Sequence, residues 1–156
     1  MNVDTTFDSQ SNTGAWGFIV RYGAGDFIAA AAGKLAHIRD PLHAEAEASL
    51  EAIEAAADLG VQRVVFESDC QVLVNALKSK EFDVAEVGVL IREARSLCCA
   101  SFESAEFTFC RRECNKVAHV LAQQAYRALV PLSIWTENAP VCVSVLVASE
   151  CAEHQS

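Results

Sequence analysis

The spacing of apolar residues first follows the two-residue period of strands and then alternates between strands and helices. Apolar and polar residues alternate in residues 1–7, and two aromatic and β-branched segments follow at residues 14–22 and 27–35. Short polar or glycine-containing turns separate the three segments, as in strands that are joined by hairpins. We therefore expect the start of the chain to form a three-stranded antiparallel meander.

Helix and strand signals alternate after residue 40. Asp40 and Pro41 have the residue types of a helix N-cap and a first helical position, and Gly60 is placed to end that helix after about residue 58. The pattern then predicts two strands at residues 63–67 and 105–110, and three helices at residues 68–78, 87–98 and 115–129. This order predicts an α/β fold with a five-stranded mixed sheet, in which a three-strand antiparallel meander and parallel strands are flanked by helices.

The length of 156 residues fits one domain. Residues 1–129 hold the alternating pattern, and we expect residues 130–156 to form a C-terminal tail of the same domain or a partly flexible extension. Within the tail, residues 141–148 are mostly apolar and predict either an added strand or a helix.

The composition predicts an intracellular protein without a membrane partner, and we expect this protein to be a monomer. Hydrophobic residues make up 52% of the chain, but no apolar run approaches the roughly 20 residues that span a bilayer. No cationic segment followed by an apolar one opens the chain, so we expect no secretory signal. The seven cysteines are odd in number and irregularly spaced, which favours reduced thiols in the nucleus or cytoplasm over a secreted disulfide framework.

Cys110, Cys114 and His119 have a spacing that resembles half of a zinc site. Structural zinc sites usually contain two such pairs of ligands, and the second pair is missing here. The sequence therefore favours small, buried core residues at the two cysteines, with a zinc site as the alternative.

The formal net charge is −9 and the isoelectric point is about 4.8. A nucleic-acid binder without sequence preference usually carries a Lys/Arg footprint for phosphates, so this charge counts against one. Clustered carboxylates, in contrast, are the ligands that hard divalent cations require. The charge is thus compatible with a metal site and unfavourable for broad nucleic-acid binding.

Two aspartates are candidates for such a site. Asp4 lies inside the first predicted strand, where an acid must face either solvent or a site. Asp69 follows the strand at residues 63–67, and ligands of open α/β sheets gather at the carboxyl ends of strands. The alternative for Asp69 is a plain helix N-cap, and the two roles do not exclude each other.

Glu45 is separated from the other acids of the first predicted helix. At about 100° per residue, the solvent-facing side of this helix holds Glu47, Glu51, Glu54 and Asp58. Glu45 falls on the opposite flank of the apolar stripe, among alanines. This position predicts that Glu45 faces a site, and the alternative is an ordinary glutamate at the boundary of the core.

Four segments carry a resemblance to a known family. They are NVDTTF, HAEAEASLEAIEAA, VVFESDCQVLVNAL and CNKVAHVLAQQA, in this order. The chain resembles ribonuclease H-like domains, and most closely the plant branch, whose modules are similar to the ribonuclease H of retrotransposon reverse transcriptases. The resemblance covers residues 1–129, and residues 135–148 also look like the end of that branch.

The resemblance implies a metal-dependent endonuclease that hydrolyses the RNA strand of RNA–DNA hybrids with two Mg²⁺ or Mn²⁺ ions. Three of the four metal-ligating acids of the family match Asp4, Glu45 and Asp69. The fourth falls on His119, a departure, because histidine is a poorer Mg²⁺ ligand but can bind a borderline metal or carry a proton. We assign catalysis and metal binding to these four residues. We assign substrate contacts to Asn115 and to Thr5, where the family usually has a small residue.

Two alternatives remain open. The first is a catalytically weak or inactive ribonuclease H-like module for nucleic-acid binding or protein interaction, which His119 and the acidic composition favour. A basic substrate-handling segment, present in some family members, has no counterpart in residues 77–88. The second is a 3′→5′ exonuclease of the wider superfamily, which would need an acid where the chain has Thr6.

Overall fold

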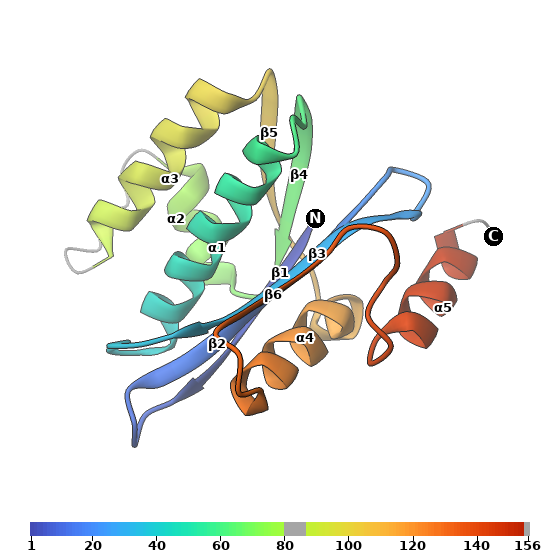
Figure 1. Cartoon of the computed structure of the whole chain (residues 1–156). Coiled ribbons are helices and arrows are strands. Elements are labelled where there is room, and N and C mark those ends of the chain that lie inside the picture. Colours follow the sequence, from blue (N-terminus) through green and yellow to red (C-terminus); the bar gives the residue numbers. More distant parts are fainter. Residues whose placement is uncertain (80–86, 155–156) are drawn as a thin grey trace.

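The computed structural model describes residues 1–79 and 87–154, and Figure 1 shows how their elements are arranged. The first elements are β1 (Asn2–Asp8), β2 (Thr13–Arg21), β3 (Phe27–Leu35) and α1 (Pro41–Asp58). The middle of the chain forms β4 (Arg63–Ser68), α2 (Gln71–Lys78), α3 (Gly88–Ser101) and β5 (Ser104–Phe109). The last part forms the short 3-10 helix η1 (Arg112–Cys114), α4 (Lys116–Arg127), β6 (Leu132–Trp135) and α5 (Ser144–His154). Residues 80–86, which belong to the segment without a basic substrate-handling counterpart, lie outside the described residues.

All of these strands form one mixed sheet in the order β5-β4-β1-β2-β3-β6. β1, β2 and β3 are antiparallel neighbours, and β4 is parallel to both β1 and β5. The predicted meander and the mixed sheet are therefore confirmed.

The sheet has six strands in the described part of the chain, so the expectation of five was wrong. The sixth strand, β6, belongs to the tail and pairs antiparallel with β3, from Ala30 opposite Trp135 to Gly33 opposite Leu132. A strand of four residues is too short to give a clear two-residue period. It forms because the outer edge of β3 offers backbone donors and acceptors that would otherwise lack partners in the sheet.

The apolar end of the tail forms a helix, α5, rather than another strand. Val143, just before α5, and Val147, within it, are buried in the same apolar cluster as Leu121 of α4. Their four-residue spacing puts both side chains on one side of a helical turn. Packing against α4 thus determines that this segment is a helix, although its β-branched residues were also compatible with a strand.

Helices cover both faces of the sheet (Figure 1). α1 and α3 lie on one face, where the core contains Phe18 and Ile53. α4 and α5 lie on the other face, where a second cluster contains Ile19 and Leu121. Phe18 and Ile19 are neighbours in β2 and point to opposite faces, as the pleat of a strand requires.

The start and the end of α1 follow the predicted signals. The Asp40 carboxylate accepts a hydrogen bond from the His43 backbone nitrogen at 2.8 Å, and Pro41 occupies the first helical turn. Gly60, just beyond the helix, has a φ of 72°, a conformation that glycine adopts without steric cost. These ends fix the helix register and place Glu45 one turn inside it.

A glycine in β2 lets α4 come close to the sheet. A Cβ atom on Gly17 would lie 2.6 Å from the backbone nitrogen of Ala122 and 2.7 Å from the carbonyl oxygen of Ala118. Both distances are far below van der Waals contact, so a larger residue would push α4 away. The close approach brings His119, the neighbour of Ala118, toward β1.

No helix within residues 1–79 and 87–154 combines the length and apolarity that a membrane span needs. Six cysteines are free thiols in the structure, namely Cys70, Cys98, Cys99, Cys110, Cys114 and Cys142. Cys110 is buried, as the core interpretation expected, whereas Cys114 is exposed. Burial raises the pKa of the Cys110 thiol to about 12, which disfavours the thiolate that zinc requires. An intracellular location stays a prediction.

Candidate active site

Strand pairing places Asp4 beside Asp69. Asn2 of β1 is aligned with Glu67 of the parallel strand β4. Asp4 and Asp69 each follow two residues later, so the two aspartates lie next to each other where β4 ends. This is the sheet edge at which the sequence predicted a site.

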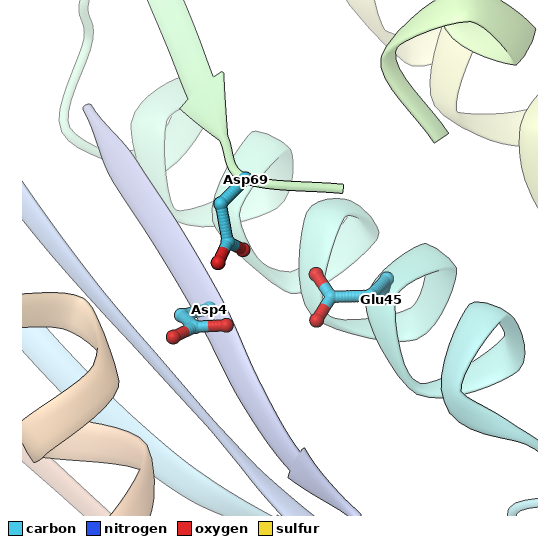
Figure 2. Close-up of side chains that lie close together, drawn as sticks. All are labelled: Asp4, Glu45 and Asp69. Atoms are coloured by element: carbon cyan, nitrogen blue, oxygen red, sulfur yellow. The ribbon is translucent and has the colours of Figure 1, made fainter. Parts of the chain in front are cut away.

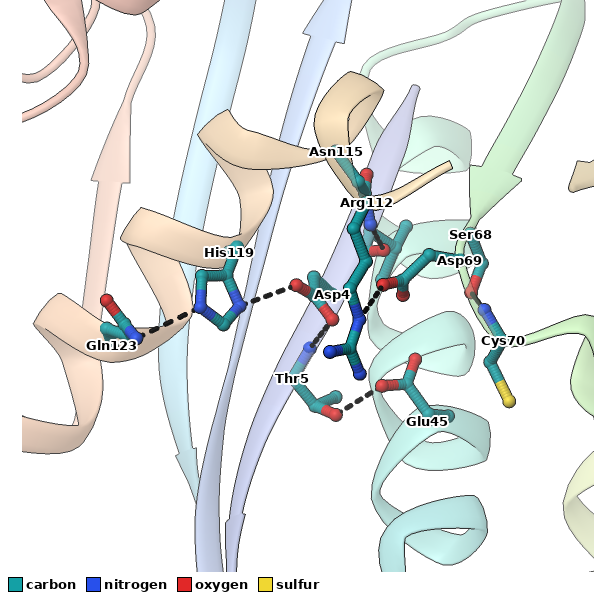
Figure 3. Close-up of polar contacts among 11 residues, drawn as sticks. Asp4, Thr5, Glu45, Ser68, Asp69, Cys70, Arg112, Asn115, His119 and Gln123 are labelled. Atoms are coloured by element: carbon teal, nitrogen blue, oxygen red, sulfur yellow. Dashed lines mark hydrogen bonds and ion pairs between the residues drawn. The ribbon is translucent and has the colours of Figure 1, made fainter. Parts of the chain in front are cut away.

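The Asp4 carboxylate is buried and both of its oxygens have hydrogen-bond partners (Figure 3). Oδ1 accepts a hydrogen bond from the Thr5 backbone nitrogen at 2.8 Å. Oδ2 lies 2.9 Å from Nδ1 of His119, in a hydrogen bond between β1 and α4. The orientation of the carboxylate is therefore fixed by β1, its own strand, and by α4, which covers the face of the sheet opposite to α1.

Asp69 does not cap α2, although the sequence allowed this role. The N-cap of α2 is Cys70, whose backbone nitrogen donates to the Ser68 hydroxyl at 3.1 Å. The Asp69 carboxylate instead accepts a hydrogen bond from Nε of Arg112 at 3.2 Å.

The structure brings Glu45, and not Glu47, to the two aspartates. Glu45 is 8% exposed and points from α1 toward Asp4 and Asp69 (Figure 2). The Thr5 hydroxyl donates a hydrogen bond to Oε1 of Glu45, and Oε2 is buried without a hydrogen-bond partner. Glu47 lies on another side of α1, 3.4 Å from Nε2 of His43.

One carboxylate oxygen of each acid, from Asp4, Glu45 and Asp69, lies within 4.8 Å of the other two (Figure 2). Among the residues that the structure describes, this is the one group of histidine, cysteine and acidic side chains with ligand atoms close enough to hold a metal. Cys110, Cys114 and His119 form no such group there. The oxygen donors and their charge suit a hard divalent cation, as Mg²⁺ and Mn²⁺ are bound in proteins.

Burial and nearby negative charge disfavour the ionised forms of Glu45 and Asp4. Burial raises the pKa of Glu45 to about 8, and the charges of Asp4 and Asp69 add to the rise, against the Thr5 hydrogen bond and the charge of Arg112. Burial and the charge of Asp69 also raise the pKa of Asp4. A cation between the three carboxylates would reverse this preference, because it stabilises their charged forms.

His119 lies beside the three acids. Its Nδ1 bonds to Asp4, and its Nε2 lies 3.0 Å from the side-chain nitrogen of Gln123, one helical turn further along α4. The imidazole is half-exposed, so it borders the cluster and solvent together. Gln123 was not predicted from the sequence, although its position four residues after His119 could have suggested the contact.

A cleft of about 660 Å³ opens over the acids. Apolar side chains of Phe7, Leu42 and Val72 line part of it, whereas Arg112 and Lys116 contribute positive charge. The two basic residues were also missed at the level of the sequence. Their signal was the presence of Arg111, Arg112 and Lys116 in a short stretch of an otherwise acidic chain.

The two residues expected to contact substrate differ in accessibility. Thr5 lines the cleft next to Glu45. Asn115 is 1% exposed, and its side-chain nitrogen donates to the Val3 carbonyl oxygen at 2.9 Å. Asn115 thus joins the start of α4 to β1, and a substrate contact by it stays a prediction.

The sequence and the fold were compared with known proteins. The sequence profile of the reverse transcriptase-like family matches residues 2–125. No curated protein matches the chain. Among solved structures, ribonuclease H1 from the halophilic archaeon Halobacterium salinarum NRC-1 is 25% identical, with 80% of this chain and 93% of that chain covered and a TM-score of 0.72.

Two further structures share the fold at lower sequence identity. The N-terminal ribonuclease H domain of a Mycobacterium tuberculosis protein is 17% identical, covers 80% of this chain and 89% of its own, and has a TM-score of 0.71. The LC11 ribonuclease H1, solved in complex with an RNA/DNA hybrid, is 16% identical, covers 80% and 94%, and has a TM-score of 0.69. The predicted ribonuclease H-like fold is therefore confirmed, whereas the closer likeness to the plant branch remains a prediction.

The raised pKa of Glu45 predicts that the metal-free protein loses stability as the pH rises. The pKa of Glu45 is about 8 in the folded state, whereas its ordinary value is 4.5. The folded state therefore binds the proton more tightly, and this contribution to stability is fully present below the lower pKa. This contribution is lost as the pH rises through the higher value. Each unit between the two values is worth about 1.4 kcal/mol, so the loss in EDTA should amount to several kcal/mol.

Urea unfolding in EDTA at about pH 5 and about pH 8 measures this loss. Glu45→Gln keeps the shape of the side chain and can still accept the Thr5 hydrogen bond. It should remove most of the pH dependence and be more stable than the wild type at the higher pH. Glu47→Gln, on another side of the same helix, should behave like the wild type. A Glu45→Gln variant that is less stable at the higher pH would contradict a buried, repelled carboxylate.

Proposed function

The chain belongs to the reverse transcriptase-like family, and we propose that it is a metal-dependent endonuclease that hydrolyses the RNA strand of RNA–DNA hybrids. The observation that carries this proposal is the convergence of Asp4, Glu45 and Asp69 at the edge of a ribonuclease H-like sheet. The RNA/DNA hybrid bound by the LC11 ribonuclease H1, which shares the fold, supports the substrate class. We further propose that the protein acts as a monomer and away from membranes.

The acids of the cluster fit a divalent metal. The buried Oε2 of Glu45 has no hydrogen-bond partner, and an unpartnered buried oxygen is costly unless a ligand satisfies it. Asp4, Glu45 and Asp69 would hold Mg²⁺ or Mn²⁺, and as the resemblance implies, we propose two ions. When bound, they would make a water molecule a better nucleophile and stabilise the negative charge of the leaving oxygen.

The basic residues of the cleft would bind the substrate backbone. The Arg112 side chain is 91% exposed, yet its Nε lies 3.2 Å from Asp69, so it connects solvent to the cluster. A phosphodiester that enters the cleft would offer the Arg112 guanidinium two acceptor oxygens in a favourable geometry. Lys116 lines the same cleft and adds a second positive charge. This local pair would supply an attraction that the net charge of −9 opposes.

As the resemblance implies, we assign His119 to the place of the fourth acid of the family. Because its Nδ1 contacts Asp4 and its ring is half-exposed, it could ligate the second ion or carry a proton between the site and solvent. A second candidate function follows from the same residue. Both ring nitrogens have hydrogen-bond partners, which favours a catalytically weak or inactive module that still binds nucleic acid.

Cleavage of an end-labelled RNA–DNA hybrid distinguishes the two functions. The wild type with Mg²⁺ or Mn²⁺ should cut the RNA strand of the hybrid and leave single-stranded and double-stranded RNA intact. Asp69→Asn removes a charged ligand and should lower the rate by more than about 100-fold. Glu47→Gln serves as the control and should retain the wild-type rate. Hybrid binding without cleavage by the wild type, with either metal, would support the inactive module.

The fourth position can be tested separately. His119→Asp restores the acid of the family and should raise Mg²⁺-dependent cleavage by about tenfold, because a carboxylate suits Mg²⁺ better than imidazole. His119→Ala should lower Mn²⁺-dependent cleavage. Equal rates for the wild type and the alanine variant with both metals would show that His119 has no part in the reaction.

A further inference from the structure

Thr5 is hydrogen-bonded to two acids of the cluster (Figure 3). Its backbone nitrogen donates to Oδ1 of Asp4 at 2.8 Å, and its hydroxyl donates to Oε1 of Glu45. One residue of β1 therefore connects a ligand on its own strand to a ligand on α1. His119 and Arg112, in contrast, each bond to a single acid, Asp4 and Asp69 respectively.

The hydroxyl bond decides which oxygen of Glu45 is available. A hydroxyl has one hydrogen to donate, and that of Thr5 is used on Oε1. Oε2 of the same carboxylate is buried and has no hydrogen-bond partner. The carboxylate as a whole points toward Asp4 and Asp69 (Figure 2). With Oε1 held by Thr5, the carboxylate cannot rotate freely, and Oε2 is kept for a ligand.

The neighbouring threonine shows that this bond is not a general property of the strand. Thr6 follows Thr5 in β1, and successive side chains of a strand point to opposite faces. The Thr6 hydroxyl is buried and has no hydrogen-bond partner. Thr5 and Thr6 are thus adjacent residues of the same type, and only the Thr5 hydroxyl contacts Glu45.

We propose that Thr5 is a positioning residue of the metal site, which orients Glu45 through its hydroxyl and Asp4 through its backbone. This assignment rests on the proposed function, since it concerns how the same acids bind a divalent ion. It differs from the substrate contact that the sequence suggested for Thr5. Threonine stands where the family usually has a small residue, and in this chain the added hydroxyl serves a metal ligand.

The test measures Mn²⁺ binding directly, by electron paramagnetic resonance of free Mn²⁺ in the absence of nucleic acid. Thr5→Val replaces the hydroxyl by a methyl group of similar size and should weaken Mn²⁺ binding by about 10- to 100-fold, the usual effect of losing a partner of a metal ligand. Thr5→Ser keeps the hydroxyl and should bind within about threefold of the wild type. Thr6→Val makes the same change one residue away and should bind like the wild type.

Circular dichroism in EDTA shows which variants are folded, and Thr5→Ala replaces Thr5→Val if valine prevents folding. If the wild type binds Mn²⁺ and the variant without the hydroxyl binds it equally well, the positioning role is overturned and the proposed function stays intact. Equal weakening by Thr6→Val would also overturn it, since the effect would then belong to the strand. A wild type that binds no Mn²⁺ would overturn both proposals.

Discussion

The confinement of three acids, Asp4, Glu45 and Asp69, in one largely buried cluster is the constraint to which the rest of the site responds. Burial disfavours the ionised forms of Glu45 and Asp4, and the charges of the neighbouring acids, whose oxygens lie within 4.8 Å of one another, add to this effect. The metal-free protein reduces the cost by keeping a proton on Glu45, whose pKa is about 8. The two apolar cores on either side of the sheet supply the stability that such a cluster requires.

Each acid is held by at least one neighbouring residue, so the site has its shape before any ion arrives. Thr5 holds Glu45, His119 holds Asp4, and Arg112 contacts Asp69. These three contacts would respond differently when a metal ion and a substrate bind. The Thr5 and His119 contacts can persist beside a metal, whereas the exposed Arg112 is free to turn toward a phosphate. A chain of net charge −9 thus presents positive charge at the cleft where we propose that nucleic acid binds.

The sequence predicted the parts of the fold and the site that depend on local signals. The positions of α1's two ends follow from Asp40, Pro41 and Gly60. The register of α1 then separates Glu45 from the acids on the solvent-facing side of the same helix. The strand β6 was missed because four residues carry no clear period, and α5 was left undecided because its packing against α4 determines it. The contacts of Thr5 and Arg112 were missed for a related reason. They join residues 40 or more positions apart, and only the folded chain brings such pairs together.

The central claim is that the three acids form a binding site for a divalent cation, and thermal unfolding with and without metal tests it most directly. A ligand that binds only the folded state raises its stability by RT ln(1 + [L]/Kd), so the Tm of the wild type should rise steadily with Mg²⁺ or Mn²⁺ concentration. Asp69→Asn should lose most of this rise while it stays folded in EDTA. A wild-type Tm that does not change at millimolar concentrations of either metal would contradict the claim.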